Sequence, residues 1–133
     1  MAILIEAEVL IQAERRLFDL EAWLLSQPDE EFKLAAVTVA ELWHSAERAA
    51  GPHWERRQLF LERLLGVFEV VPYTRETGVD HARIWTDLEV SGQTMAVHEL
   101  IVAATAIQTG SAVATFNKRH YAVVKNLTVI EPK

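Results

Sequence analysis

The chain has 133 residues, of which 50% are hydrophobic and 24% are charged. These values predict one compact globular domain, spanning 1–133, that is large enough to bury a core of its own. The absence of cysteine excludes disulfides, thiolate zinc sites and a cysteine nucleophile. A formal net charge of −6 argues against a protein that coats nucleic acid electrostatically. It leaves open a nuclease, because a metal-binding carboxylate cluster is itself acidic.

The chain shows no signal for export or membrane insertion. The apolar start, Met1 to Ile11, carries Glu6 and Glu8 and lacks the preceding basic residues of a signal peptide. The longest apolar run, Leu100 to Ile107, is far shorter than the ~20 residues that a membrane helix requires. We therefore expect a cytoplasmic protein with no membrane segment.

Short apolar strands are predicted to alternate with helices along the whole chain. In chain order we expect a strand at Ala2–Ile5, helices at Val9–Arg16 and Phe18–Ser26, a strand at Leu34–Val37, helices at Thr38–Ala50 and Trp54–Leu65, a strand at Val67–Val71, helices at Thr74–Val90 and His98–Thr109, and strands at Ala112–Thr115 and Leu127–Ile130. Gly110 is placed to end the His98–Thr109 helix. Strands that are apolar on both faces predict an α/β fold of three layers, α/β/α, with a short parallel sheet covered by helices.

Acidic and amide side chains occur where these strands end or where the following helices begin. They are Glu6 and Glu8 after the first strand, Glu41 near the start of the Thr38–Ala50 helix, Glu99 in the first turn of the His98–Thr109 helix, and Asn117 after the fourth strand. Ligands of parallel sheets gather outside the carboxyl ends of the strands, so we expect these residues on one edge. Glu6 and Glu8 point to the same side if the chain is still extended there. Glu8 is equally explained as a solvated residue at a helix start.

Three or four carboxylates with an amide oxygen form an all-oxygen site, which suits Mg²⁺ or Mn²⁺. Such a site activates water and stabilises the charge that develops on a phosphodiester. Lys118 and Arg119 follow Asn117 directly and are candidates for phosphate contact, although such basic pairs usually form a solvated face. This combination is compatible with a metal-dependent nuclease.

Most of these residues also have a purely structural explanation. Thr38 and Glu41 match a capping box, in which both side chains satisfy free amides at a helix start. Glu99 in a first turn is favoured by the helix dipole, and Asn117 is an ordinary turn residue. Glu6 is harder to explain this way, because a carboxylate at the end of a buried strand needs a partner or a cation.

Five segments of the chain, in this order and at this spacing, form a pattern that covers almost its whole length. They are Ile3–Ile11, Thr38–Leu42, Glu99–Ala106, Ala114–Tyr121 and Leu127–Ile130. The pattern resembles the PIN-domain family, and within it the VapC-type toxins of bacterial toxin–antitoxin pairs. The resemblance implies an endoribonuclease that uses Mg²⁺ or Mn²⁺, forms a homodimer and binds a cognate antitoxin.

The resemblance also implies a role for individual positions. The catalytic and metal-binding residues would be Glu6, Glu41, Glu99 and Asn117, with Glu8 as a further carboxylate and with Thr115 and His120 as accessory residues. The first and third positions hold Glu where the family has Asp, and His120 stands in place of an acid. Glu is one methylene longer, and a misplacement of about 1 Å can lower a rate on the order of 10²-fold. The alternative is therefore a catalytically impaired PIN-fold module for binding or dimerisation.

Two further interpretations remain. A receiver-like domain needs an acceptor Asp after a middle strand, whereas Val67–Val71 runs into Pro72 and Tyr73, which disfavours it. Apolar residues on helix faces would form either a dimer or antitoxin groove or the domain's own core. They include Trp43, Leu59, Phe60 and Leu64.

Overall fold

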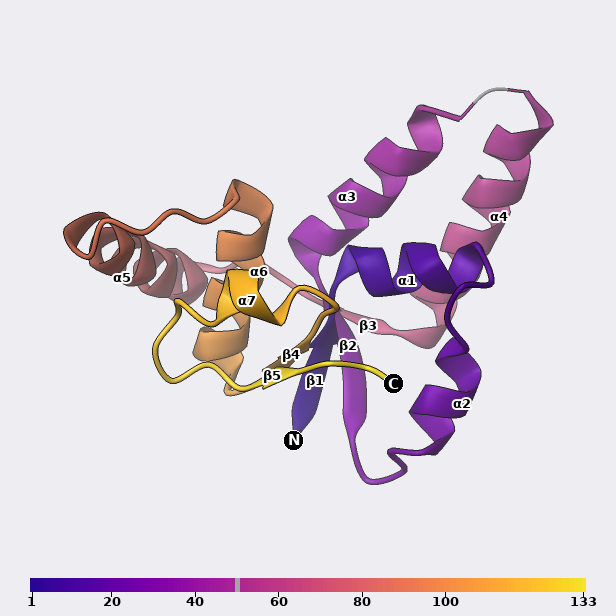
Figure 1. The fold of residues 1–133 in the computed structure, drawn as a ribbon. Coiled ribbons are helices and arrows are strands. Elements are labelled where there is room, and N and C mark those ends of the chain that lie inside the picture. Colours follow the sequence, from indigo (N-terminus) through magenta and orange to yellow (C-terminus); the bar gives the residue numbers. More distant parts are fainter. Residues whose placement is uncertain (50) are drawn as a thin grey trace.

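A parallel sheet of five strands, in the order β3-β2-β1-β4-β5, lies at the centre of the computed structural model, which describes residues 1–49 and 51–133 (Figure 1). The strands are β1 Ala2–Ile5, β2 Glu31–Ala35, β3 Glu69–Val71, β4 Ala112–Ala114 and β5 Val129–Ile130. The chain adds β2 and β3 on one side of β1, then crosses to add β4 and β5 on the other. The strand order therefore reverses between β1 and β4, where open α/β sheets bind their ligands.

The helices cover both faces of this sheet (Figure 1). One face packs against α1 Ala7–Glu14, α2 Leu20–Leu25, α3 Ala36–Glu47 and α4 Pro52–Val67, and the other against α5 Arg75–Val90, α6 Val97–Thr109 and α7 Lys118–Tyr121. The predicted three-layer α/β/α fold is confirmed. Among the described residues no helix combines the length and the apolarity needed to cross a membrane.

The apolar run of β1 supplies side chains to both helical layers. Ile3 and Ile5 are buried in the core cluster that includes Leu10 of α1, whereas Leu4 is buried in the cluster that includes Tyr121 of α7. Successive side chains of a strand point to opposite faces, so a strand covered on both sides is apolar throughout. Full burial of an aliphatic side chain stabilises the fold by about 1.5–3 kcal/mol. Both layers are therefore anchored on the strand that leads directly into Glu6.

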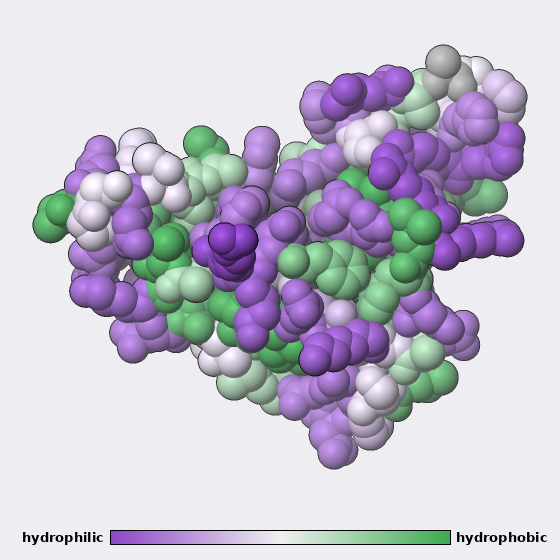
Figure 2. All heavy atoms as spheres, viewed as in Figure 1, coloured by the Kyte–Doolittle hydropathy of each residue, from purple (hydrophilic) through white to green (hydrophobic). Residues whose placement is uncertain are grey.

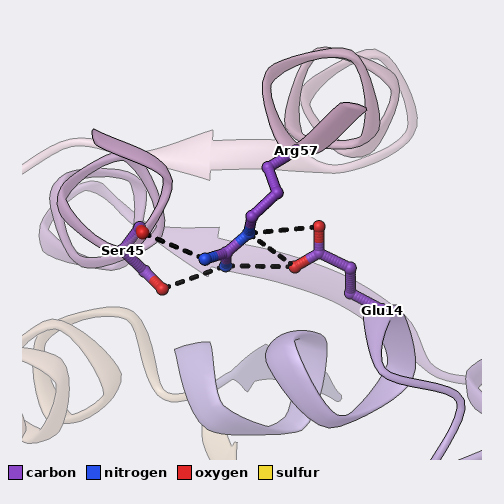
Figure 3. Close-up of polar contacts among 3 residues, drawn as sticks. All are labelled: Glu14, Ser45 and Arg57. Atoms are coloured by element: carbon purple, nitrogen blue, oxygen red, sulfur yellow. Dashed lines mark hydrogen bonds and ion pairs between the residues drawn. The ribbon is translucent and has the colours of Figure 1, made fainter. Parts of the chain in front are cut away.

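Helices α3 and α4 lie side by side and extend away from the sheet (Figure 1). Arg57 of α4 fastens this pair to α1 (Figure 3). Its Nε lies 3.1 Å and its Nη2 3.0 Å from Oε1 of Glu14. Its Nη1 donates to the carbonyl oxygen of Ser45 and its Nη2 to the hydroxyl of Ser45, both at 2.9 Å. One guanidinium thus joins α1, α3 and α4.

The apolar residues singled out on α3 and α4 belong mostly to the core of the chain. Leu64 is buried, Trp43 and Phe60 pack against the same core cluster, and only Leu59 is exposed, at 50%. Figure 2 shows that hydrophilic side chains cover most of the far end of the α3–α4 pair on the face in view. The core explanation therefore holds for three of the four residues.

Several predicted boundaries differ from the observed ones, most clearly around β2 and α3. The strand runs from Glu31 to Ala35, and α3 begins at Ala36 rather than at Thr38. Pairing of β2 with β1, Ala2 opposite Glu31, fixes the strand earlier in the chain. The Thr38–Glu41 capping box is wrong, since Thr38 lies inside the helix and its buried hydroxyl has no hydrogen-bond partner among the described residues. The last residue of that predicted helix, 50, lies outside the described ranges.

Two further segments differ from an expectation or extend it. The chain is not extended at Glu8, because α1 begins at Ala7, so the alternative of a residue at a helix start holds. The four-residue helix α7, Lys118–Tyr121, was not predicted at all. The remaining elements were predicted in the right order, with ends that differ by a few residues.

Candidate active site

A cavity of about 1010 Å³ lies beside Glu6, the residue that follows β1. It brings together six of the predicted site residues: Glu6, Glu8, Glu41, Glu99, Asn117 and His120. They come from the end of β1, from α1, α3 and α6, and from the turn and short helix after β4. Figure 2 shows hydrophilic side chains gathered where α7 and the sheet end of α3 face each other. We call this space the carboxylate cavity.

The carboxylate of Glu6 is buried, with 6% of the residue exposed. Thr115 donates its hydroxyl to Oε1 at 2.7 Å, and Tyr121 donates its hydroxyl to Oε2 at 2.6 Å. Burial raises the pKa of Glu6; the two hydroxyls oppose this, and the charges of Glu99 and Glu8 add to it. Burial and the neighbouring Glu6 raise the pKa of Tyr121 as well, so its hydroxyl keeps its proton and remains a donor.

Glu41 approaches the same space from the second turn of α3. Burial raises its pKa; His98 opposes the rise, and the charges of Glu6 and Glu99 add to it. Neighbouring carboxylates thus make Glu6 and Glu41 harder to ionise. A cation placed among them would remove that repulsion.

Glu99 lies in the first turn of α6 and pairs with His120 of α7. The distance from His120 Nδ1 to Glu99 Oε2 is 2.8 Å, and the side chains are 58% and 17% exposed. The histidine that replaces an acid of the family pattern therefore lies against a carboxylate of the cavity.

The turn after β4 places the remaining predicted residues. The hydroxyl of buried Thr115 accepts a hydrogen bond from the backbone N–H of Asn117 at 2.9 Å. Asn117 directly precedes α7, and its side chain makes no capping bond. Lys118 and Arg119 do not line the carboxylate cavity. They border an adjacent cavity of about 530 Å³ that shares Phe116, Asn117 and His120 with it.

Sequence reasoning missed four side chains of this site. Tyr121 holds Glu6, His98 lies near Glu41, His44 lines the cavity, and Gln12 donates to Glu8 at 2.8 Å. Spacing could have identified Gln12, which is one helical turn after Glu8, and adjacency to Glu99 could have identified His98. The role of Tyr121 had no such local signal.

The donor set of the cavity is suited to a hard divalent cation, because its carboxylate oxygens are the ligands that Mg²⁺ and Mn²⁺ prefer. Burial raises the pKa of Glu6 and of Glu41, and the charge of Glu99 adds to both shifts, so a cation would favour the ionised form of each. Within residues 1–49 and 51–133, however, no three His, Cys, Asp or Glu side chains are gathered as a ready-made metal site. The chemistry of the residues nevertheless fits a cation, because the lining of the cavity supplies carboxylate oxygens from Glu6, Glu41 and Glu99.

Comparison with known proteins supports the sequence resemblance. The family model for the PIN domain matches residues 3–126. Ribonuclease VapC1 of Rickettsia felis is 25% identical over 131 residues, covering 98% of this chain and 96% of that protein. VapC ribonuclease Y4jK of Sinorhizobium fredii is 33% identical over 100 residues, covering 71% and 70%.

Solved structures share the fold over the whole chain. The crystal structure of VapBC2 from Rickettsia felis bound to a promoter DNA fragment matches with a TM-score of 0.90 at 18% identity, over 100% of both chains. FitAcB from Neisseria gonorrhoeae matches with a TM-score of 0.75 at 26% identity, over 99% of this chain and 98% of that one. This chain belongs to the PIN-domain family and, within it, to the VapC-type proteins.

Proposed function

We propose that this chain is a toxin of the VapC type that hydrolyses RNA phosphodiesters with Mg²⁺ or Mn²⁺ held by Glu6, Glu41 and Glu99. One observation carries the proposal. These three carboxylates, from three separate elements, line one cavity next to the point where the strand order reverses. The curated relatives are named ribonucleases, which supports the choice of RNA as substrate.

The residues of the cavity would have two roles, holding the cation and orienting the side chains that hold it. Glu6, Glu41 and Glu99 would supply the charged oxygens, while Asn117 and Glu8 would complete or orient the ligand set. A bound divalent cation supplies a polarised water and stabilises charge on the phosphodiester. Glu6 is buried and Glu41 is half-buried, and charges that are partly removed from water attract a cation more strongly than exposed ones.

Lys118 and Arg119 would contact RNA phosphates beside the carboxylates. Both are exposed on α7, and the cavity that they border shares residues with the carboxylate cavity. A chain with a net charge of −6 needs such a local positive patch to let RNA approach. RNA cleavage of this kind would take place in the cytoplasm.

The partners of the similar structures suggest partners for this chain. Several of those structures are VapBC toxin–antitoxin complexes. We therefore expect a protein antitoxin and a homodimer of this chain. Sedimentation at micromolar concentration tests the second expectation, and a monomer under those conditions contradicts it.

The test of the nuclease is Mn²⁺ titration by calorimetry, paired with cleavage of structured RNA. Wild type should bind Mn²⁺ and cleave, whereas Glu6→Gln, Glu41→Gln and Glu99→Gln should each lower the cleavage rate by on the order of 10²-fold. Glu62→Gln is the matched control, because Glu62 is an exposed residue of α4 that does not line the cavity. Equal cleavage by wild type and all four variants would disprove the assignment.

A catalytically impaired binding module is the second candidate, and one observation favours it. The described side chains form no ready-made metal site, and two positions hold the longer Glu. The double variant E6D/E99D separates the two candidates. Mn²⁺ binding and cleavage by the double variant alone would indicate a lapsed enzyme, and their absence from both proteins would leave the binding module.

A further inference from the structure

Tyr121 brings a hydroxyl to the buried side of the carboxylate cavity. Its ring is fully buried in the core cluster with Leu4 and Val113, so packing alone explains an aromatic side chain at this position. Packing does not explain the hydroxyl, which donates to Glu6 at 2.6 Å across 115 residues of sequence. A buried tyrosine hydroxyl needs a polar partner, and here the partner is a carboxylate of the proposed metal site.

The two oxygens of Glu6 are held from two different elements. Thr115, just after β4, donates to Oε1, and Tyr121, at the end of α7, donates to Oε2. An ionised carboxylate has about four lone-pair sites, so two remain for other partners. Because both oxygens are fixed, the long side chain of Glu6 has a single orientation in spite of its flexible stem.

We propose that Tyr121 is a positioning residue, whose hydroxyl orients the Glu6 carboxylate so that its free lone pairs are directed at a divalent cation in the cavity. The proposal rests on the proposed metal-dependent function and adds to it a residue that makes a glutamate usable at this position. Residues that orient metal ligands typically contribute about 10–100-fold to metal affinity.

The hydrogen bond between Tyr121 and Glu6 depends on the length of the side chain at position 6. Aspartate is shorter than glutamate by one carbon–carbon bond, about 1.5 Å. A carboxylate drawn back by that distance cannot keep a 2.6 Å bond to the hydroxyl of Tyr121. The tyrosine hydroxyl should therefore strengthen Mn²⁺ binding in the wild type and leave Mn²⁺ binding unchanged in Glu6→Asp. A merely structural hydroxyl would have the same effect in both backgrounds.

The experiment measures Mn²⁺ affinity by calorimetry for wild type, Y121F, E6D and E6D/Y121F, with thermal melting to verify the fold. The matched control is Y73F, since Tyr73 is the only other tyrosine of the chain and its hydroxyl contacts His81 at 2.7 Å, outside the cavity. We expect Y121F to bind Mn²⁺ about tenfold or more weakly than wild type. Y73F should match wild type, and E6D/Y121F should match E6D within about twofold.

The outcomes separate this inference from the function on which it rests. If wild type binds Mn²⁺ and Y121F binds it equally well, the positioning role is wrong while the metal site stands. If the Tyr121→Phe change lowers Mn²⁺ affinity equally in the wild-type and E6D backgrounds, the positioning role is also wrong, because the hydroxyl would then act independently of Glu6. If wild type binds no Mn²⁺, both proposals fail. Should Y121F not fold, E6D/Y121F provides the test, since it should fold and bind Mn²⁺ as E6D does.

Discussion

The Nδ1 atom of His120 lies 2.8 Å from the Oε2 atom of Glu99 and so joins α7 to α6 at the edge of the carboxylate cavity. The histidine is 58% exposed and the glutamate 17%. A contact this open to water contributes little to stability. The side chain of His120 also lines the cavity, next to a proposed metal ligand.

Replacing His120 by alanine should leave the fold intact and the metal site at least as strong. We expect the unfolding free energy to change by less than about 1 kcal/mol, because the pair is solvent-screened. Mn²⁺ affinity at pH 7 should not fall, since the proposed ligands are oxygens. Urea denaturation and calorimetry measure the two quantities, with His53→Ala, at an exposed position outside the cavity, as control. A clear loss of affinity would identify His120 as a ligand.

The stability of the chain should depend on pH through its buried carboxyls. The pKa of Glu41 is raised above its ordinary value of 4.5. A carboxyl of this kind stabilises the folded state below that value, and the stabilisation is lost as the pH rises through the folded pKa. The unfolding free energy of wild type, relative to Glu41→Gln, should therefore fall as the pH rises above 4.5. Glu6 has a pKa shifted in the same direction and should behave alike.

Urea denaturation at a series of pH values without metal measures this difference. Glu62→Gln, which removes an exposed carboxyl of α4, serves as the control and should follow the wild-type profile. A wild-type protein that gained stability relative to Glu41→Gln on raising the pH would contradict the prediction.

Local patterns predicted the elements whose ends depend on local interactions. Thr74 caps α5 through a reciprocal bond with Thr77, and Gly110 ends α6 with a φ of 66°, as glycine allows. The Thr38–Glu41 pattern has the same form as a cap but failed, because sheet pairing carries β2 only to Ala35 and α3 follows at once. Tertiary pairing outweighs a capping preference that is worth about 1 kcal/mol.

The sequence predicts those site residues that directly follow the end of a strand. Glu6 and Asn117 come after neighbouring parallel strands, so their convergence follows from topology alone. The bond between Tyr121 and Glu6 could not be predicted, because it joins residues 115 positions apart through a short helix with no sequence signal. The position of Lys118 and Arg119 beside the cavity depends on the same helix.

Removing the guanidinium of Arg57 should loosen the α3–α4 pair. Arg57→Met leaves Glu14 and the hydroxyl of Ser45 without their partner in a region where both charged side chains are less than one-fifth exposed. We expect a loss of about 2 kcal/mol in unfolding free energy, measured by urea denaturation.

The control for Arg57 is Arg83→Met. Arg83 is 75% exposed and makes a single ion pair, 3.8 Å long, with Asp80. Its removal should change the unfolding free energy by less than about 0.5 kcal/mol. Equal effects of the two substitutions would mean that the contacts of Arg57 add nothing beyond an ordinary surface charge.

Thr115→Val should weaken both stability and Mn²⁺ binding, because one hydroxyl has two partners. Valine fills the same space in a fully buried position, so packing is preserved, but Glu6 loses a donor and the N–H of Asn117 loses its acceptor. We expect a loss of about 1–3 kcal/mol in unfolding free energy, together with weaker Mn²⁺ binding. Thr115→Ser retains the hydroxyl and should recover most of the Mn²⁺ binding.

Thr86→Val is the stability control for Thr115→Val. It removes an exposed hydroxyl on α5 and should change the unfolding free energy by about 0.5 kcal/mol at most. Normal Mn²⁺ binding by Thr115→Val would show that the Thr115 hydroxyl supports the fold without orienting Glu6.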